Sequence, residues 1–148
     1  MLYRNSKPSV FISLLFAAGL VLAADSERHQ QVDGMDIYLG VMPAQLTQEH
    51  PGMHGSKMDK EHSYHILVAL FDSKTRKRIT DAKVKATVSL IGMGGSTKKL
   101  EPMRDEPLSY GNYFTLHEPE IYRIKVDIRR GDSKHVSVAE FTFRRPRD

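Results

Sequence analysis

The chain concentrates histidine and methionine side chains between positions 50 and 65. Four histidines and two methionines lie within these sixteen residues: His50, Met53, His54, Met58, His62 and His65. Imidazole nitrogen and thioether sulfur together suit copper, which binds such ligands more tightly than most competing divalent metals. The sequence has no cysteine, so methionine is the available soft donor, and thiolate metal sites and cysteine nucleophiles are excluded. The cluster predicts a metal site, with copper as the preferred ion.

The first 24 residues have the pattern of an export signal. Arg4 and Lys7 precede an apolar run from Val10 to Leu22, and small residues follow at Ala23 and Ala24. The run is shorter than the roughly 20 residues that a transmembrane helix needs. We expect a signal peptide at 1–24, a periplasmic location if the source is Gram-negative, and no transmembrane segment after cleavage. An uncleaved membrane anchor is the alternative.

The net charge gives little reason to expect a nucleic-acid partner. The full chain has 22 basic and 18 acidic residues, and removal of Arg4 and Lys7 lowers the net charge from +4 to +2. Basic residues also cluster at 129–130 and 144–147. We interpret these clusters as solvated strand ends, with a binding patch as the alternative.

Alternating apolar and polar residues predict an all-β domain over residues 25–148. Between 83 and 90 the apolar residues share one face and Lys83 and Lys85 share the other, and the stretch from 122 to 129 repeats the pattern. Seven strands are expected, at 35–41, 64–71, 83–91, 98–103, 110–116, 122–129 and 136–143. A bulge near Ala139 would bring Val136 and Val138 onto the face of Phe141. This pattern is typical of an immunoglobulin-like antiparallel β-sandwich.

The expected topology brings the metal-binding residue types to one end of the sandwich. If successive strands alternate in direction, a His/Met-rich loop at about 43–62 shares an end with the loops at 92–96 and 117–120. The preferred ligands are residues that separate segments bring to this end: His54, His65, Met93 and His117. His50, Met53 and Met58 are second choices, and His62 joins His65 only if the strand begins after His62. Alternatively, Met93 plugs the core, His65 is a buried hydrogen-bonded residue and the loop is solvated.

Two local patterns resemble known exported sandwiches. The segment Leu70–Val84 resembles the hairpin D-x-x-T-x-x-x-I-x-x-A-x-V of many immunoglobulin-like surface modules, which is specific for fold. In outline, residues 35–143 resemble CopC-like and YtkA-like copper-handling proteins and the P19-type periplasmic iron-transport proteins, through Tyr38–Leu39, Tyr110–Tyr113 and Ile121–Val126. CopC-like proteins usually place a histidine near the mature N-terminus. Here His29 lies a few residues further in, so that ligand is not carried over.

The sequence therefore favours an exported copper-binding protein that acts in metal delivery, storage or accessory transport. Its expected partners are the metal ion and an envelope transporter or membrane complex. The alternative is an interaction or assembly module of an envelope complex that binds no metal. No nucleophile elbow, zinc-protease helix or phosphate loop occurs in the sequence, so we expect no enzyme and no catalytic residues.

Overall fold

A computed structural model describes residues 27–46, 61–103 and 109–147. These residues form eight strands and one short 3-10 turn, η1 (Ala44–Leu46). The strands are β1 (His29–Val32), β2 (Met35–Pro43), β3 (Ser63–Asp72), β4 (Ala82–Leu90), β5 (Gly95–Pro102), β6 (Tyr110–Thr115), β7 (Ile121–Arg130) and β8 (Ser137–Arg144). The prediction of an all-β, immunoglobulin-like sandwich is confirmed. Within the described ranges no helix is long and apolar enough to cross a membrane.

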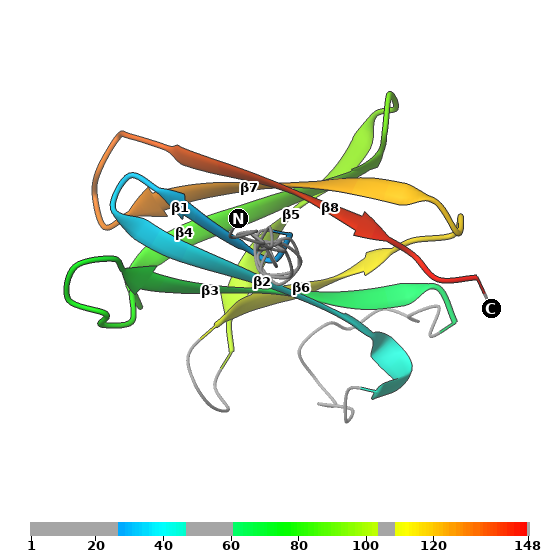
Figure 1. The fold of residues 1–148 in the computed structure, drawn as a ribbon, viewed down its shortest axis with the longest axis horizontal. Helices are drawn as coiled ribbons and strands as arrows, with labels where there is room; N and C mark the ends of the chain where they lie inside the picture. Colours follow the sequence, from blue (N-terminus) through cyan, green and yellow to red (C-terminus); the bar gives the residue numbers. More distant parts are fainter. Residues whose placement is uncertain (1–26, 47–60, 104–108, 148) are drawn as a thin grey trace, which may run out of the picture.

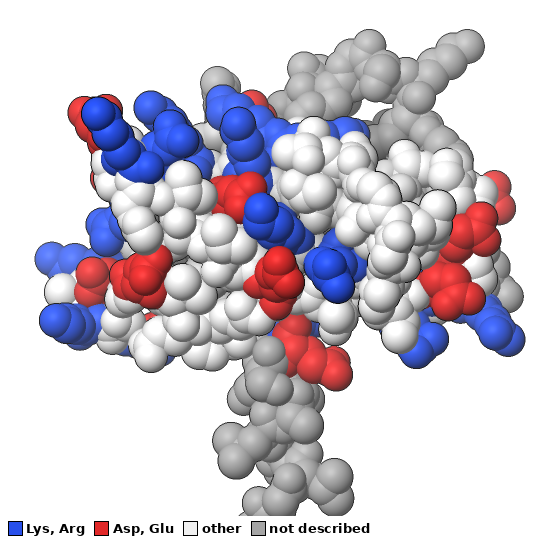
Figure 2. All heavy atoms as spheres, turned by 90° about the horizontal axis from the view of Figure 1, so that it is seen from above, with Lys and Arg blue, Asp and Glu red and all other residues white. Residues whose placement is uncertain are grey.

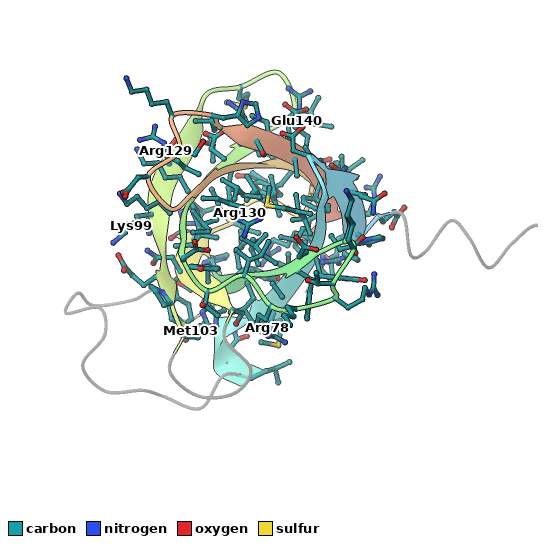
Figure 3. All side chains as sticks on the ribbon, turned by 90° about the vertical axis from the view of Figure 1, so that its left-hand side faces the viewer. Arg78, Lys99, Met103, Arg129, Arg130 and Glu140 are labelled. Atoms are coloured by element: carbon teal, nitrogen blue, oxygen red, sulfur yellow. The ribbon has the colours of Figure 1, made fainter. Side chains whose placement is uncertain are left out.

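All strand pairs are antiparallel, in the order β1-β2-β3-β6-β5-β4-β7-β8. The sheet folds into two facing layers at the β5–β6 junction, where only the pairs Glu101↔Gly111 and Pro102↔Tyr110 join the strands. The first and last strands then meet, because the Gln30 side chain donates to the Glu140 carbonyl and accepts from the Glu140 amide at 3.3 Å. The strands therefore surround the side chains of the core (Figure 3).

The core contains the apolar faces that alternation predicted. Val84, Ala86 and Val88 of β4 are at most 5% exposed, and four β7 residues lie beside them: Tyr122, Ile124, Val126 and Ile128. β3 is the central strand of its layer, between β2 and β6, and it buries Tyr64, Ile66, Val68 and Leu70. Burial of this kind stabilises a domain by about 25 cal/mol per Å² of apolar surface removed from water.

Three details differ from the prediction. The strand β1 precedes the seven expected ones, and β5 begins at Gly95 rather than at Lys98. The predicted bulge near Ala139 is wrong, because β8 pairs with β7 in continuous register from Ser137 to Arg144. Small residues, Ser137 and Ala139, face the core ahead of Phe141, whereas Val138 points outward. The valines therefore indicated the wrong face of the strand.

The sandwich has two ends, which collect different connections (Figure 1). The start of β3, the β4–β5 turn and the β6–β7 connection lie at the right-hand end of Figure 1. The β1–β2, β3–β4 and β7–β8 connections lie at the left-hand end. The expected signal peptide at 1–24 and most of the expected His/Met-rich loop lie outside the described residues.

Candidate metal site

Two imidazoles meet at the right-hand end of the sandwich. His62 immediately precedes β3 and His117 follows β6 by two residues. The two strands pair through Ser63 and Thr115, and the next hydrogen bond, from the Leu116 amide to the His62 carbonyl at 2.8 Å, extends the pairing beyond the strand. Their ring centroids are 5.1 Å apart, with planes inclined at 46°. The backbone pairing of β3 with β6 therefore fixes the two histidines as neighbours.

This separation is compatible with two ligands on one ion. Imidazole nitrogens lie about 2.0–2.1 Å from a tetrahedral metal ion, so two rings bound to one ion have centroids roughly 5 Å apart. The observed 5.1 Å matches this separation of the centroids. The pair can also be held by ring contact alone, since aromatic centroids 4.5–7 Å apart attract each other.

A thioether and a carboxylate belong to the same end. Met93 and Glu118 line one pocket with His117, and Phe114 and Tyr122 form part of its apolar wall. Met93 is 66% exposed in the β4–β5 turn, where its amide donates to the Leu90 carbonyl at 3.1 Å. The pocket thus combines the donor types that were predicted from the sequence, on two separate connections.

Backbone geometry fixes both connections. Gly92 precedes Met93 with a φ of +80°, in the left-handed region that glycine adopts without strain. The Tyr122 hydroxyl accepts a hydrogen bond of 3.0 Å from the Glu118 amide, which holds the β6–β7 connection against β7. Met93 and the His117–Glu118 segment are therefore presented from ordered backbone.

His65 occupies a different place from the pocket. It lies on the outer face of β3, opposite Met42 on one side and Tyr113 on the other. Its ring stacks on Tyr113, with centroids 4.4 Å apart and planes inclined at 15°, and the residue is 9% exposed. A Cβ atom placed on Gly111 would lie 2.7 Å from His65 Nε2, so the glycine leaves room for the imidazole.

The predicted site residues therefore divide into three groups. His117 and Met93 line one pocket, with His62 against His117, whereas His65 belongs to the outer face of β3. His50, Met53, His54 and Met58 lie outside the described residues. Across the parts of the chain that the structure describes, no group of three or more His, Cys, Asp or Glu residues could hold a metal ion. The proposed set is different, because it includes the sulfur of a methionine.

Sequence reasoning missed two partners of His65. Tyr113 and Gly111 both belong to the Tyr-Gly-Asn-Tyr segment, whose resemblance to other sandwiches does not indicate contact with a histidine. The alternation of β6 places both residues on the outer face, as it does His65 on β3. The signal was present, but it required the register between strands more than forty residues apart in the chain.

Solved structures share this fold. A copper-bound variant of FetP from uropathogenic Escherichia coli strain F11 is 11% identical, with a TM-score of 0.62, over 80% of this chain and 93% of that one. A copper-bound variant of Campylobacter jejuni P19 gives the same identity and TM-score over 80% and 94% of the two chains. A DUF4426 family protein of Pseudomonas aeruginosa is 14% identical, with a TM-score of 0.62, over 82% and 96%. No family model matches the sequence, and no curated protein matches it.

At these identities the comparisons establish the fold. The resemblance to P19-type proteins that the sequence indicated is therefore confirmed as a likeness of architecture. FetP was also crystallised after recombinant expression in the periplasm of Escherichia coli.

Proposed function

We propose that this chain is an exported copper-binding protein whose site lies at the right-hand end of the sandwich. His62 and His117 supply imidazole ligands and Met93 supplies a thioether. The protein acts in copper delivery, storage or accessory transport, and an envelope transporter or membrane complex is its expected protein partner. The proposed location is the periplasm if the source is Gram-negative, and the predicted export signal at 1–24 supports it.

The pairing of His62 with His117 carries the proposal. Three connections bring two imidazoles and a methionine to one end of the fold, and the 5.1 Å between the rings suits two ligands of one ion. Thioether and imidazole together favour copper over harder ions. The copper-bound FetP and P19 variants with this fold support the choice of metal.

The segment at 47–60 offers further donors. The sequence predicts that His50, Met53, His54 and Met58 contribute ligands, and this stays a prediction. A copper site needs two to four ligands, so each of these side chains could complete a set that begins with the paired imidazoles.

The test is a competition titration of the purified protein with Cu(I) and Cu(II). The double variant His62→Ala/His117→Ala should lose stoichiometric binding. The matched control is His135→Ala. It removes an exposed imidazole of the β7–β8 connection that is hydrogen-bonded to Asp33. Equal affinities in the double variant and the control would refute the site and leave the alternative of an interaction module.

A further inference from the structure

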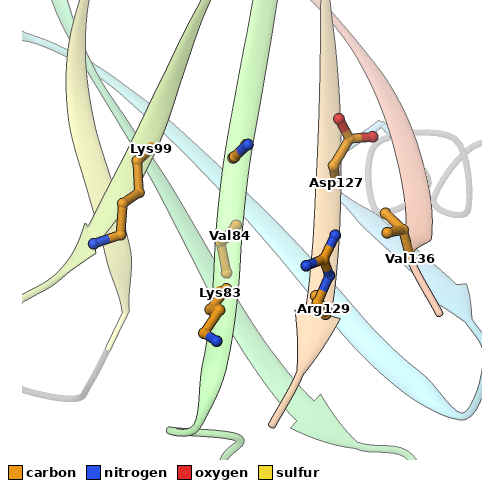
Figure 4. A pocket seen from close by; sticks show the side chains of 7 residues that line it. Lys83, Val84, Lys99, Asp127, Arg129 and Val136 are labelled. Carbon is orange, nitrogen blue, oxygen red and sulfur yellow. The ribbon is translucent and has the colours of Figure 1, made fainter. Parts of the chain in front are cut away.

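The outer face of β4, β5 and β7 carries two rows of basic side chains. Strand register places Lys85 of β4 between Lys99 of β5 and Asp127 of β7. One step further along, Lys83 of β4 lies opposite Arg129 of β7. These side chains line a groove of about 370 Å³. Figure 4 shows Lys83, Lys99, Asp127 and Arg129 around it, and Figure 3 shows Lys99 and Arg129 pointing away from the core on the same side. We call this surface the basic groove.

Two cross-strand pairs in the basic groove join residues of like charge. Lys83↔Arg129 and Lys85↔Lys99 are paired positions, and like charges directly opposite each other destabilise a sheet. Four cations and one carboxylate line the groove. That carboxylate, Asp127, already contacts Lys125 at 3.3 Å. The Lys85–Asp127 neighbours offset part of this repulsion, and the groove keeps a net positive charge.

The acidic residues nearby relieve only part of this charge. Lys99 contacts Glu101 at 3.1 Å, but the side chains of that pair are 61% and 41% exposed. Exposed ion pairs of this kind typically contribute about 0–1 kcal/mol, so an incoming carboxylate can exchange with Glu101 at little cost. Seen from above, basic side chains gather at the left-hand end of the molecule, and a broad uncharged area lies to the right of centre (Figure 2).

The groove has an apolar border beside the charge. Val136 lines it, and Val138 is the cross-strand neighbour of Asp127. The two valines are 38% and 40% exposed, whereas the smaller Ser137 and Ala139 of the same segment face the core. An occupant that matches this surface therefore combines carboxylates with an apolar side chain.

We propose that the basic groove docks an acidic, extended segment of a protein partner. Side chains on one face of an extended chain repeat about every 6.6 Å, which is also the spacing of Lys83 and Lys85 along β4. Two carboxylates two residues apart share one face of such a segment and can pair with the two rows, and an apolar residue two positions further along that face can cover Val136 or Val138. A small anion would reach one row and leave the valines uncovered. A membrane surface would not enter a recess between side chains.

The groove is separate from the proposed copper site. Most of its residues belong to the start of β4 and the end of β7, next to the β3–β4 and β7–β8 connections at the left-hand end of Figure 1. His62 and His117 belong to the start of β3 and to the β6–β7 connection, at the right-hand end. Docking can therefore succeed or fail whatever the copper titration shows.

The test measures fluorescence anisotropy of a labelled peptide, Ser-Glu-Ser-Glu-Ser-Val, with the full-length protein; when the peptide is extended, its two Glu and its Val share one face. We expect saturable binding that weakens as ionic strength rises from about 0.01 M to about 0.15 M, because the screening length falls to about 8 Å. Lys83→Glu/Lys85→Glu should weaken binding about tenfold or more, since it replaces two attractions with repulsions. The matched control is Lys74→Glu/Lys77→Glu, which makes the same charge change on the exposed β3–β4 turn.

Three outcomes would overturn the proposal: no binding of the peptide, equal weakening by the groove variant and the control, or equal binding of a peptide in which Ser replaces Val. Sedimentation with phosphatidylcholine vesicles that contain phosphatidylglycerol covers the membrane alternative. Vesicle binding that the groove variant abolishes, without peptide binding, would assign the surface to lipid instead. Circular dichroism confirms that each variant is folded.

Discussion

His62 and His65 are three residues apart, yet the fold gives them different surroundings. β3 begins at Ser63, so His62 stays at the end of the sandwich beside His117, whereas His65 enters the strand and stacks on Tyr113. One is a neighbour of a second imidazole and of a pocket with a thioether; the other fills a space that Gly111 leaves on a packed face. The comparison teaches that membership of a local cluster does not establish a ligand, since the strand boundary decides which side chains can converge.

Replacing each histidine separately tests this difference most directly. His62→Ala should lower copper affinity by more than the roughly 10–100-fold that loss of a supporting residue around a metal typically costs, because it removes a proposed ligand. His65→Ala should change copper affinity less than tenfold but lower the free energy of unfolding by about 1–3 kcal/mol, through lost packing on Tyr113. Competition titration and urea unfolding measure the two effects. The reverse pattern would move the site to the outer face of β3.

Enlarging Gly111 should disturb the surroundings of His65 in particular. In Gly111→Ala the new Cβ would meet His65 Nε2 and Leu67 Cδ2, each at 2.7 Å, so the side chains must shift. We expect a loss of about 1–3 kcal/mol, as for other overpacked sites. In a His65→Ala background the loss should be smaller, and a double-mutant cycle measures the coupling. Additive losses would show that Leu67, rather than the imidazole, resists the change.

Met93→Leu should separate the two oxidation states of copper. Leucine keeps the size and apolar character of the side chain but lacks the sulfur donor that suits Cu(I). We expect Cu(I) affinity to fall about tenfold, or about 1.4 kcal/mol, with little change for Cu(II). Because Met93 is 66% exposed, the unfolding midpoint should not move. Met42→Leu on β2, opposite His65, is the matched control, and an equal loss in both variants would argue against a specific role for Met93.

Much of the fold could be predicted from local pattern, because alternation reports which side of a strand is wet. The faces of β4 and β7 and the central position of β3 followed from it. β8 was misread because its valines face solvent while Ser137 and Ala139 face the core. The contact of His62 with His117 and the rows of the basic groove depend on register between distant strands. Lys83 and Lys85 are visible as alternating residues, but their alignment with Lys99 and Arg129 is not.

The opposite end of the sandwich provides the smallest and most selective prediction. There the Asp33 carboxylate accepts hydrogen bonds from Ser137 Oγ at 2.7 Å and His135 Nε2 at 2.9 Å, which join the β1–β2 turn to the start of β8. These bonds, first that of His135 and then that of Ser137, lower the pKa of Asp33 below its ordinary value of 3.8. A carboxyl with a lowered pKa in the folded state stabilises the protein above its unfolded-state pKa, and this contribution disappears as pH falls through the folded-state pKa.

Ser137→Ala should therefore be slightly less stable than the wild type at pH 5–7, and part of the difference should disappear below pH 3.8. Urea unfolding across this pH range measures the effect, and Thr142→Ala on the same strand is the control, since its exposed side chain is not among the groups that lower the pKa of Asp33. Copper affinity should be the same in both variants, because the proposed ligands lie at the other end. A change in copper affinity with Ser137→Ala alone would show that the two ends are coupled through the sheet. The difference between His62 and His65 would then depend on more than the position at which β3 begins.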